Sequence, residues 1–223
     1  MHHSMLVTAF SQFGGFSVNP AELILKQLSE YYVGFDMEKI VLPVDYNFVV
    51  QRLPQLYLRL RPAIALHLGV NEKISHLCLE RRAKNLTSQD QPDINGVIKH
   101  DAPIDDSAPA EFITDLDLEN LKMKLIDLDL KADLKADSKA DLQYEISEDA
   151  GSYLCNFAYY TALQTIKQHQ LQTQCLFVHV PVPNDINVQA ESVAEKKIVS
   201  NYSLAELTVG VSNILALLSG AYR

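Results

Sequence analysis

Three side chains in this sequence could together carry out nucleophilic catalysis: Cys155, His179 and Glu80. Cys155 follows a turn at Gly151 and is expected in the first turn of a helix. Free backbone N–H groups and the helix dipole favour the reactive thiolate there. The same N–H groups could hold a developing oxyanion. A cysteine among Tyr and Leu residues is also typical of a small buried core residue, so position alone leaves both interpretations open.

His179 lies near the carboxyl end of an apolar strand, and an imidazole supplies the near-neutral base that a thiol nucleophile needs. A single histidine on such a strand is equally typical of a hydrogen-bonded core residue. Glu80 ends the run Leu77–Glu80 and could hold the imidazole in one tautomer as the third member of a triad. Because two arginines follow Glu80, a solvated ion pair is the alternative.

Short apolar runs alternate with amphipathic segments along the chain, which predicts an α/β fold: a three-layer α/β/α sandwich with a mostly parallel twisted sheet. In such folds, sites form outside the carboxyl ends of the strands. We expect the helix over Tyr46–Leu60 to be kinked or split at Pro54. The expected strands are Met5–Phe10, Lys39–Pro43, Ala63–Gly69, Leu77–Glu80, Leu142–Ile146 and Cys175–Val180. The other expected helices are Asn19–Glu30, Leu116–Ile126, Ser152–Gln168 and Ser203–Leu218.

The 223 residues are predicted to form one domain. Within it, Met1–Ser4 are expected to be an addition ahead of a natural start at Met5, and Gln89–Ala110 a long loop. Residues 129–141 carry a four-residue repeat, Lys131–Asp141, that places Lys on Lys and Asp on Asp at i,i+4. Like charges at this spacing destabilise a helix, so a solvated insertion is predicted, with a short exposed helix as the alternative.

Composition excludes several classes of protein. The net charge of −9 disfavours nucleic acid as a partner, because such binding needs basic patches. We expect no membrane span and no secretory signal. Three scattered cysteines do not suggest a disulfide framework, so a cytoplasmic protein is expected. The histidines and cysteines lack zinc-site spacing, and we predict neither a metal nor an organic cofactor.

The chain resembles the pyroglutamyl peptidase type I (pyrrolidone-carboxylate peptidase) family through four blocks in the family's order. The third block is similar to the ISxDAGxYLCxFxYY pattern of animal members and is the most specific. The chain departs from bacterial members, which carry a GxAGGR segment where it has Gly69–Ile74. The four blocks are Val7–Gly15 with Asn19–Pro20; His67–Val70 with Leu79–Glu80 and Asn85; Ile146–Tyr160; and Phe177–Pro181.

This resemblance implies a phosphorylase/hydrolase-like fold and a thiol peptidase that removes N-terminal pyroglutamate (5-oxoproline) from peptides. Cys155 would be the nucleophile, His179 the base and Glu80 the residue that orients His179, with a thioester acyl-enzyme as intermediate. The lactam of pyroglutamate is neutral and flat, so its pocket should be largely apolar. A monomer or a homo-oligomer up to a tetramer fits the family. The residues implied to bind substrate are Phe10, Phe13, Asn19, Val70 and Leu154. For Asn19, ordering of its loop is the first expectation.

Two other functions remain open. A catalytically inactive relative could bind pyroglutamyl-capped peptides without cleaving them. A nucleoside-phosphorylase-like enzyme could share the fold class, although no phosphate-binding pattern of Gly, Arg and Ser is visible in the sequence.

Overall fold

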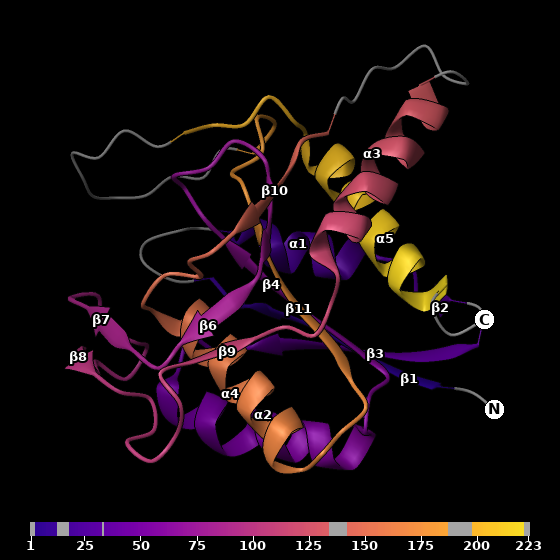
Figure 1. Ribbon diagram of the computed structural model, residues 1–223. Coiled ribbons are helices and arrows are strands. Elements are labelled where there is room, and N and C mark those ends of the chain that lie inside the picture. Colours follow the sequence, from indigo (N-terminus) through magenta and orange to yellow (C-terminus); the bar gives the residue numbers. More distant parts are fainter. Residues whose placement is uncertain (1–2, 13–17, 33, 134–141, 187–197, 221–223) are drawn as a thin grey trace.

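The computed structural model describes residues 3–12, 18–32, 34–133, 142–186 and 198–220. These residues contain a central seven-stranded sheet with strand order β10-β5-β11-β4-β1-β3-β2 (Figure 1). Only the β11–β5 and β2–β3 pairs of this sheet are antiparallel, so the prediction of a mostly parallel sheet is confirmed. The strands are β1 (His3–Phe10), β2 (Tyr31–Tyr32), β3 (Phe35–Leu42), β4 (Ile64–Val70), β5 (Leu77–Glu80), β10 (Tyr144–Ser147) and β11 (Gln174–Val180).

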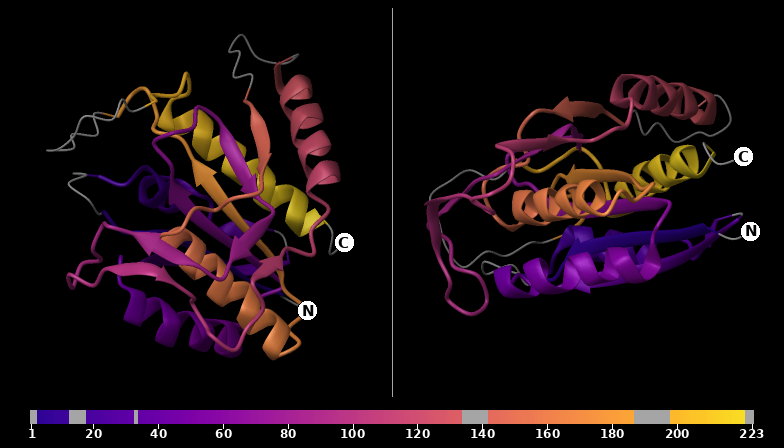
Figure 2. Two further views of the ribbon diagram at one scale, coloured as in Figure 1. Left: turned by 60° about the vertical axis from the view of Figure 1, so that its left-hand side comes forward. Right: turned by 60° about the horizontal axis from the view of Figure 1, so that its bottom comes forward.

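Helices cover both faces of the sheet and complete the three predicted layers (Figure 2). One face carries α1, α3 and α5, and the other carries α2 and α4. Two short antiparallel pairs, β6–β9 and β7–β8, lie outside the main sheet. The helices are α1 (Pro20–Gln27), α2 (Tyr46–Leu60), α3 (Leu118–Asp133), α4 (Leu154–Gln168) and α5 (Leu204–Gly220). The short strands are β6 (Arg82–Lys84), β7 (Thr87–Gln89), β8 (Lys99–Ala102) and β9 (Glu111–Ile113).

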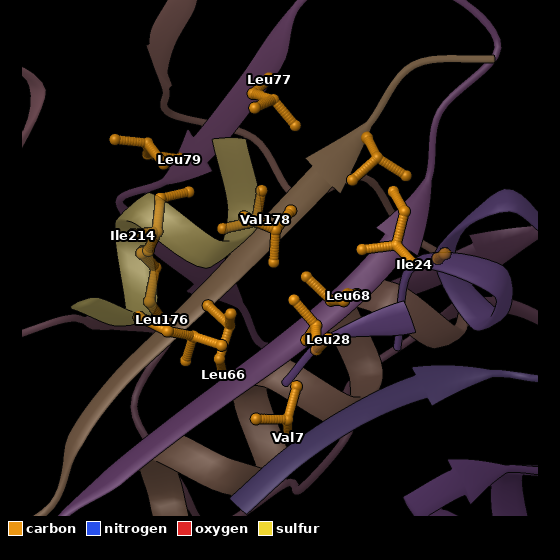
Figure 3. Packing of buried hydrophobic residues seen from close by; sticks show 14 of the residues in the cluster. Val7, Ile24, Leu28, Leu66, Leu68, Leu77, Leu79, Leu176, Val178 and Ile214 are labelled. Atoms are coloured by element: carbon orange, nitrogen blue, oxygen red, sulfur yellow. The ribbon is translucent and has the colours of Figure 1, made fainter. Parts of the chain in front are cut away.

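The sheet separates two apolar cores. On the first face, aliphatic side chains of β4, β11 and β5 pack against α1 and α5, as Leu66, Val178 and Ile214 illustrate (Figure 3). The second face is more aromatic, and its cluster includes Phe10, Leu154 and Phe177 beneath α2 and α4. Because alternate residues of a strand point to opposite faces, the parity of a residue in its strand decides which core it joins.

Helix α2 runs through Pro54 without a break, so of the two predicted outcomes, a kink or a split, the split is wrong. Asp45 caps the helix by accepting hydrogen bonds from the N–H groups of Asn47 and Phe48. The apolar face that packs against the sheet includes Leu53 and Tyr57, one residue before and three after the proline. Burial of this face on both sides of Pro54 therefore outweighs the one missing backbone hydrogen bond.

Three further expectations need correction. The predicted loop over residues 89–110 contains β8, which pairs with β7. Residues 129–133 of the predicted insertion form the end of α3, and Asp129 is buried and accepts a hydrogen bond from Asn213. The rest of the repeat, residues 134–141, lies outside the described residues. Strand β1 begins at His3, two residues before its expected start at Met5.

Candidate active site

Glu80 and His179 form a buried pair on adjacent strands. His179 Nδ1 donates to Glu80 Oε1 over 2.7 Å, and both side chains are almost wholly buried. β5 runs antiparallel to β11, with Glu80 opposite Phe177, so Glu80 approaches His179 diagonally across the strand pair. Glu80 is the last residue of β5, and because β5 runs opposite to β11, Glu80 lies beside the middle of β11 and not beside its carboxyl end.

The two arginines after Glu80 do not pair with it. Arg81 and Arg82 both form ion pairs with Glu148, in the loop that leads to α4. The alternative of a solvated ion pair therefore applies to these arginines, whereas Glu80 points into the protein with His179 as its partner.

Cys155 occupies the second position of α4, as predicted for a first-turn thiol. The cap residue Tyr153 has extended backbone, and its side chain accepts no hydrogen bond from the helix. The preceding loop is tied to β7, because the Ser152 hydroxyl and the Ser88 N–H each donate to the other residue's backbone carbonyl. The arrangement leaves Cys155 beside the positive end of a helix that a loop anchors in place.

Because Gly69 has no side chain, the Cys155 thiol can lie close against the sheet. In β4, Gly69 lies directly beside His179 in the β4–β11 register. A Cβ atom at Gly69 would lie 2.7 Å from Cys155 Sγ and 2.9 Å from the Phe177 ring, closer than real contacts allow. Gly69 is not among the site residues expected from the sequence. A glycine inside an apolar strand is the signal that could have found it, because it often marks a close approach.

The charge on His179 is set by its two partners. Burial lowers the pKa of an imidazole, but the charge and hydrogen bond of Cys155, together with the hydrogen bond and charge of Glu80, outweigh burial and raise the pKa of His179. The favoured form of His179 is thus the charged imidazolium, held between the Cys155 sulfur and the Glu80 carboxyl group. Cys155 is also the one partly accessible thiol, whereas burial raises the pKa of Cys78 and of Cys175 to about 12.

Comparison with known proteins places the chain in a family. A family model described as pyroglutamyl peptidase matches residues 3–216. This chain belongs to the pyroglutamyl peptidase family. It is 32% identical over 181 residues to pyrrolidone-carboxylate peptidase of Thermococcus kodakarensis, covering 81% of this chain and 82% of that protein. The corresponding protein of Pyrococcus furiosus is 31% identical over 185 residues, covering 82% and 83% of the two chains.

The fold agrees with this assignment. A structure of pyrrolidone carboxyl peptidase from Thermococcus litoralis superposes with a TM-score of 0.82 at 26% identity, covering 99% of this chain and 94% of that one. The chain is accordingly an enzyme of the pyroglutamyl peptidase type. These comparisons give no support to an inactive relative or to a nucleoside phosphorylase. Within the described residues, none of the helices is long and apolar enough to cross a membrane.

The residues implied to bind substrate divide between the two cores. Phe10 and Leu154 belong to the aromatic cluster that also contains Phe177, and Cys155 packs against this cluster. Val70 is placed in the other cluster, because the residue after Gly69 points to the opposite face of the sheet. Its side chain therefore points away from the face that carries Cys155. Phe13 lies outside the described residues.

Asn19 orders the loop after β1. Its Nδ2 group donates to the backbone carbonyls of Phe10 and Ser11, and its Oδ1 accepts from the N–H of Ala21 at the start of α1. The side chain is wholly buried, so its hydrogen-bonding capacity is spent on the backbone. Of the two expectations for Asn19, the geometry favours ordering of the loop over contact with a ligand.

Proposed function

We propose that this chain removes N-terminal pyroglutamate from peptides through a Cys155–His179–Glu80 triad. The observation that carries the proposal is the buried His179 side chain: it bonds to Glu80 through Nδ1, and its strand neighbour Gly69 leaves room for Cys155 Sγ. Membership of the pyroglutamyl peptidase family supports both the reaction and the substrate.

In this mechanism, the Cys155 thiolate attacks the carbonyl carbon that joins pyroglutamate to the next residue. The first-turn N–H groups of α4 stabilise the resulting oxyanion. Imidazolium His179 gives its proton to the departing amine as the C–N bond breaks, which leaves a thioester on Cys155. Water, deprotonated by His179, then hydrolyses the thioester and releases pyroglutamate. Glu80 keeps the Nδ1–H of His179 oriented throughout.

The substrate class follows from chemistry as well as from the family. Pyroglutamate has no free α-amine and no charge, so burying it in an apolar environment costs less than burying a charged terminus. Phe10 and Leu154 are almost wholly buried in the apolar cluster against which Cys155 packs, and such surroundings suit a neutral lactam better than a charged terminus. A cytoplasmic location fits a catalytic thiol, which a reducing compartment keeps free.

The test is release of a fluorescent amine from a pyroglutamyl amide by the reduced protein without added metal. We expect wild type to turn over, and Cys155→Ala to lose at least about 10³-fold in kcat/KM, because the nucleophile is gone. Cys175→Ser is the matched control and should retain activity, since that thiol is buried away from His179. A prolyl amide, which carries the charged amine, should be a poor substrate.

Two results would contradict the proposal. The first is a folded, reduced wild type that does not release the amine. The second is a folded Cys155→Ala protein that still cleaves the substrate at the wild-type rate.

A further inference from the structure

Besides Cys155, helix α4 contains two residues that link it to the segment that carries Glu80. Asn156, the next residue, is wholly buried, and within the described part of the chain its side chain bonds only to the backbone of the segment after Glu80. Its Oδ1 accepts from the N–H of Lys84 over 2.8 Å, and its Nδ2 donates to the carbonyls of Lys84 at 2.8 Å and Leu86 at 2.9 Å. The first turn of α4 is thereby fixed to β6 and to the residues that follow it.

Tyr159 makes a second link, one turn further along the helix. Its side chain is wholly buried, and its hydroxyl donates to the backbone carbonyl of Glu80 over 3.0 Å. Its ring lies 5.7 Å from the ring of Phe177, which in turn lies 4.9 Å from the His179 ring. Tyr159 therefore bonds to the backbone of Glu80 and lies beside Phe177, the ring next to His179.

The Glu80 carboxylate depends on such backbone anchors. Its Oε1 accepts from His179, whereas its buried Oε2 has no hydrogen-bond partner among the described residues. With one hydrogen bond, the carboxylate is not held by a network of its own, and its place relative to His179 follows from where the backbone of Glu80 lies. The hydroxyl of Tyr159 donates a hydrogen bond to the carbonyl of this backbone, at the end of β5.

We propose that Tyr159 is a positioning residue of the triad, and that with Asn156 it makes the nucleophile's own helix hold the Glu80 segment at the right distance from Cys155. The inference rests on the proposed roles of Cys155, His179 and Glu80. One rigid element then places the thiol and the acid together, so their geometry does not depend on two independent loops.

The chain offers a matched pair of variants to test this. Tyr160 is also wholly buried, and its hydroxyl donates to the carbonyl of Pro109, away from Glu80. Tyr159→Phe and Tyr160→Phe each remove one hydroxyl from α4 and one bond to a backbone carbonyl. We expect similar losses of thermal stability, but only Tyr159→Phe should lower kcat, by about tenfold, with KM within about twofold of wild type.

The pH profile of Cys155 alkylation by iodoacetamide gives a readout that a purely structural role would not move. In wild type, charged His179 should stabilise the Cys155 thiolate, so Cys155 should react with iodoacetamide even in mildly acidic solution. A displaced Glu80 supports the imidazolium less well, so the profile of Tyr159→Phe should shift to higher pH. The profile of Tyr160→Phe should coincide with that of wild type.

Equal kcat values and equal alkylation profiles for the two tyrosine variants, in an active wild-type background, would overturn the inference and leave the proposed function intact. An inactive wild type would instead count against the proposed function.

A second pair of variants tests the inference if Tyr159→Phe fails to fold: Asn156→Ala, with Asn85→Ala as control. Asn85 likewise bonds only to backbone, at Ile104, Asp105 and Ala108, and does not link α4 to the Glu80 segment. We then expect the kcat loss for Asn156→Ala alone, and equal losses would overturn the inference.

Discussion

Two buried histidines on the same sheet face carry opposite charge preferences. His67 Nδ1 shares a hydrogen bond with the Thr8 hydroxyl and Nε2 shares one with the Tyr57 hydroxyl, each 2.7 Å long. Burial among these neutral partners lowers the pKa of His67 to about 3. His179 is buried to a similar degree, but a thiol and a carboxylate raise its pKa. Partners, and not burial alone, decide which histidine can hold a proton at neutral pH.

The raised pKa of His179 makes a prediction about stability. A group whose pKa is higher in the folded than in the unfolded state stabilises the fold below its unfolded pKa, and this contribution is lost as pH rises through the folded pKa. The stability advantage of wild type over His179→Gln should therefore be largest in mildly acidic solution and shrink as pH rises into the alkaline range, by about 1.4 kcal/mol per unit of raised pKa.

Urea unfolding of both proteins between pH 6 and pH 10 measures this difference. His169→Gln, at an exposed position, corrects for effects of the substitution that are not specific to the site. An advantage that grows with rising pH would show that the folded state does not favour the charged form of His179.

Gly69 makes a second prediction at the scale of single residues. The new methyl group of Gly69→Ala would lie 2.7 Å from Cys155 Sγ, so the thiol must move away from its place beside His179. We expect kcat/KM for a pyroglutamyl amide to fall by about 10²-fold, the cost of a displacement of roughly 1 Å at a reacting atom. Gly220→Ala, in open space at the end of α5, should leave activity unchanged. Full activity of Gly69→Ala would mean that the close approach of Sγ to Gly69 is not needed.

At the scale of elements, strand direction and helix continuity depend on tertiary packing. The predicted ranges of β5 and α2 match the structure, because apolar runs and caps are local signals. The antiparallel placement of β5 beside β11 has no local signal, since the pattern Leu77–Glu80 reads the same in either direction. Pro54 likewise signals a break that packing on both sides overrides.

Pro54 tests how much α2 loses by containing a proline. Pro54→Ala restores an N–H group that can bond within the helix and removes the clash of the ring with the preceding turn. Part of this gain is offset because the unfolded chain becomes more flexible. We expect the free energy of unfolding to rise by about 1–2 kcal/mol, measured by urea denaturation, with kcat/KM unchanged. Gln51→Ala, on the exposed face of α2, should change stability by less than about 0.5 kcal/mol. A lower stability of Pro54→Ala would show that α2 requires the fixed backbone angle of proline.

Across the whole molecule, the fold buries two of the three cysteines and leaves the third partly exposed. Cys175 is buried beneath α2, where its sulfur lies 3.4 Å from the Tyr57 hydroxyl, and Cys78 is buried beside His179 in the sheet. Cys155 alone is partly exposed. The fold thus leaves one thiol within reach of reagents and substrates.

This distribution predicts selective labelling. Brief treatment of the native protein with iodoacetamide should add one adduct, on Cys155, with parallel loss of activity, because the other two thiols are buried with raised pKa values. Mass spectrometry of intact protein and peptides counts and places the adducts. Labelling in denaturant should give three. Rapid native labelling of Cys78 or Cys175 would contradict the packing described here.

Spacing, caps and side-chain chemistry are local, and they were enough to predict the alternation of strands and helices, the first-turn position of Cys155, and a thiol, an imidazole and a carboxylate as candidate reacting groups. Three other features come from tertiary pairing. Glu80 reaches His179 from an antiparallel neighbour, Val70 faces the other core, and Gly69 leaves room for the Cys155 thiol. Strand direction, face and close approach arise from pairing between segments far apart in the chain, which no local pattern records.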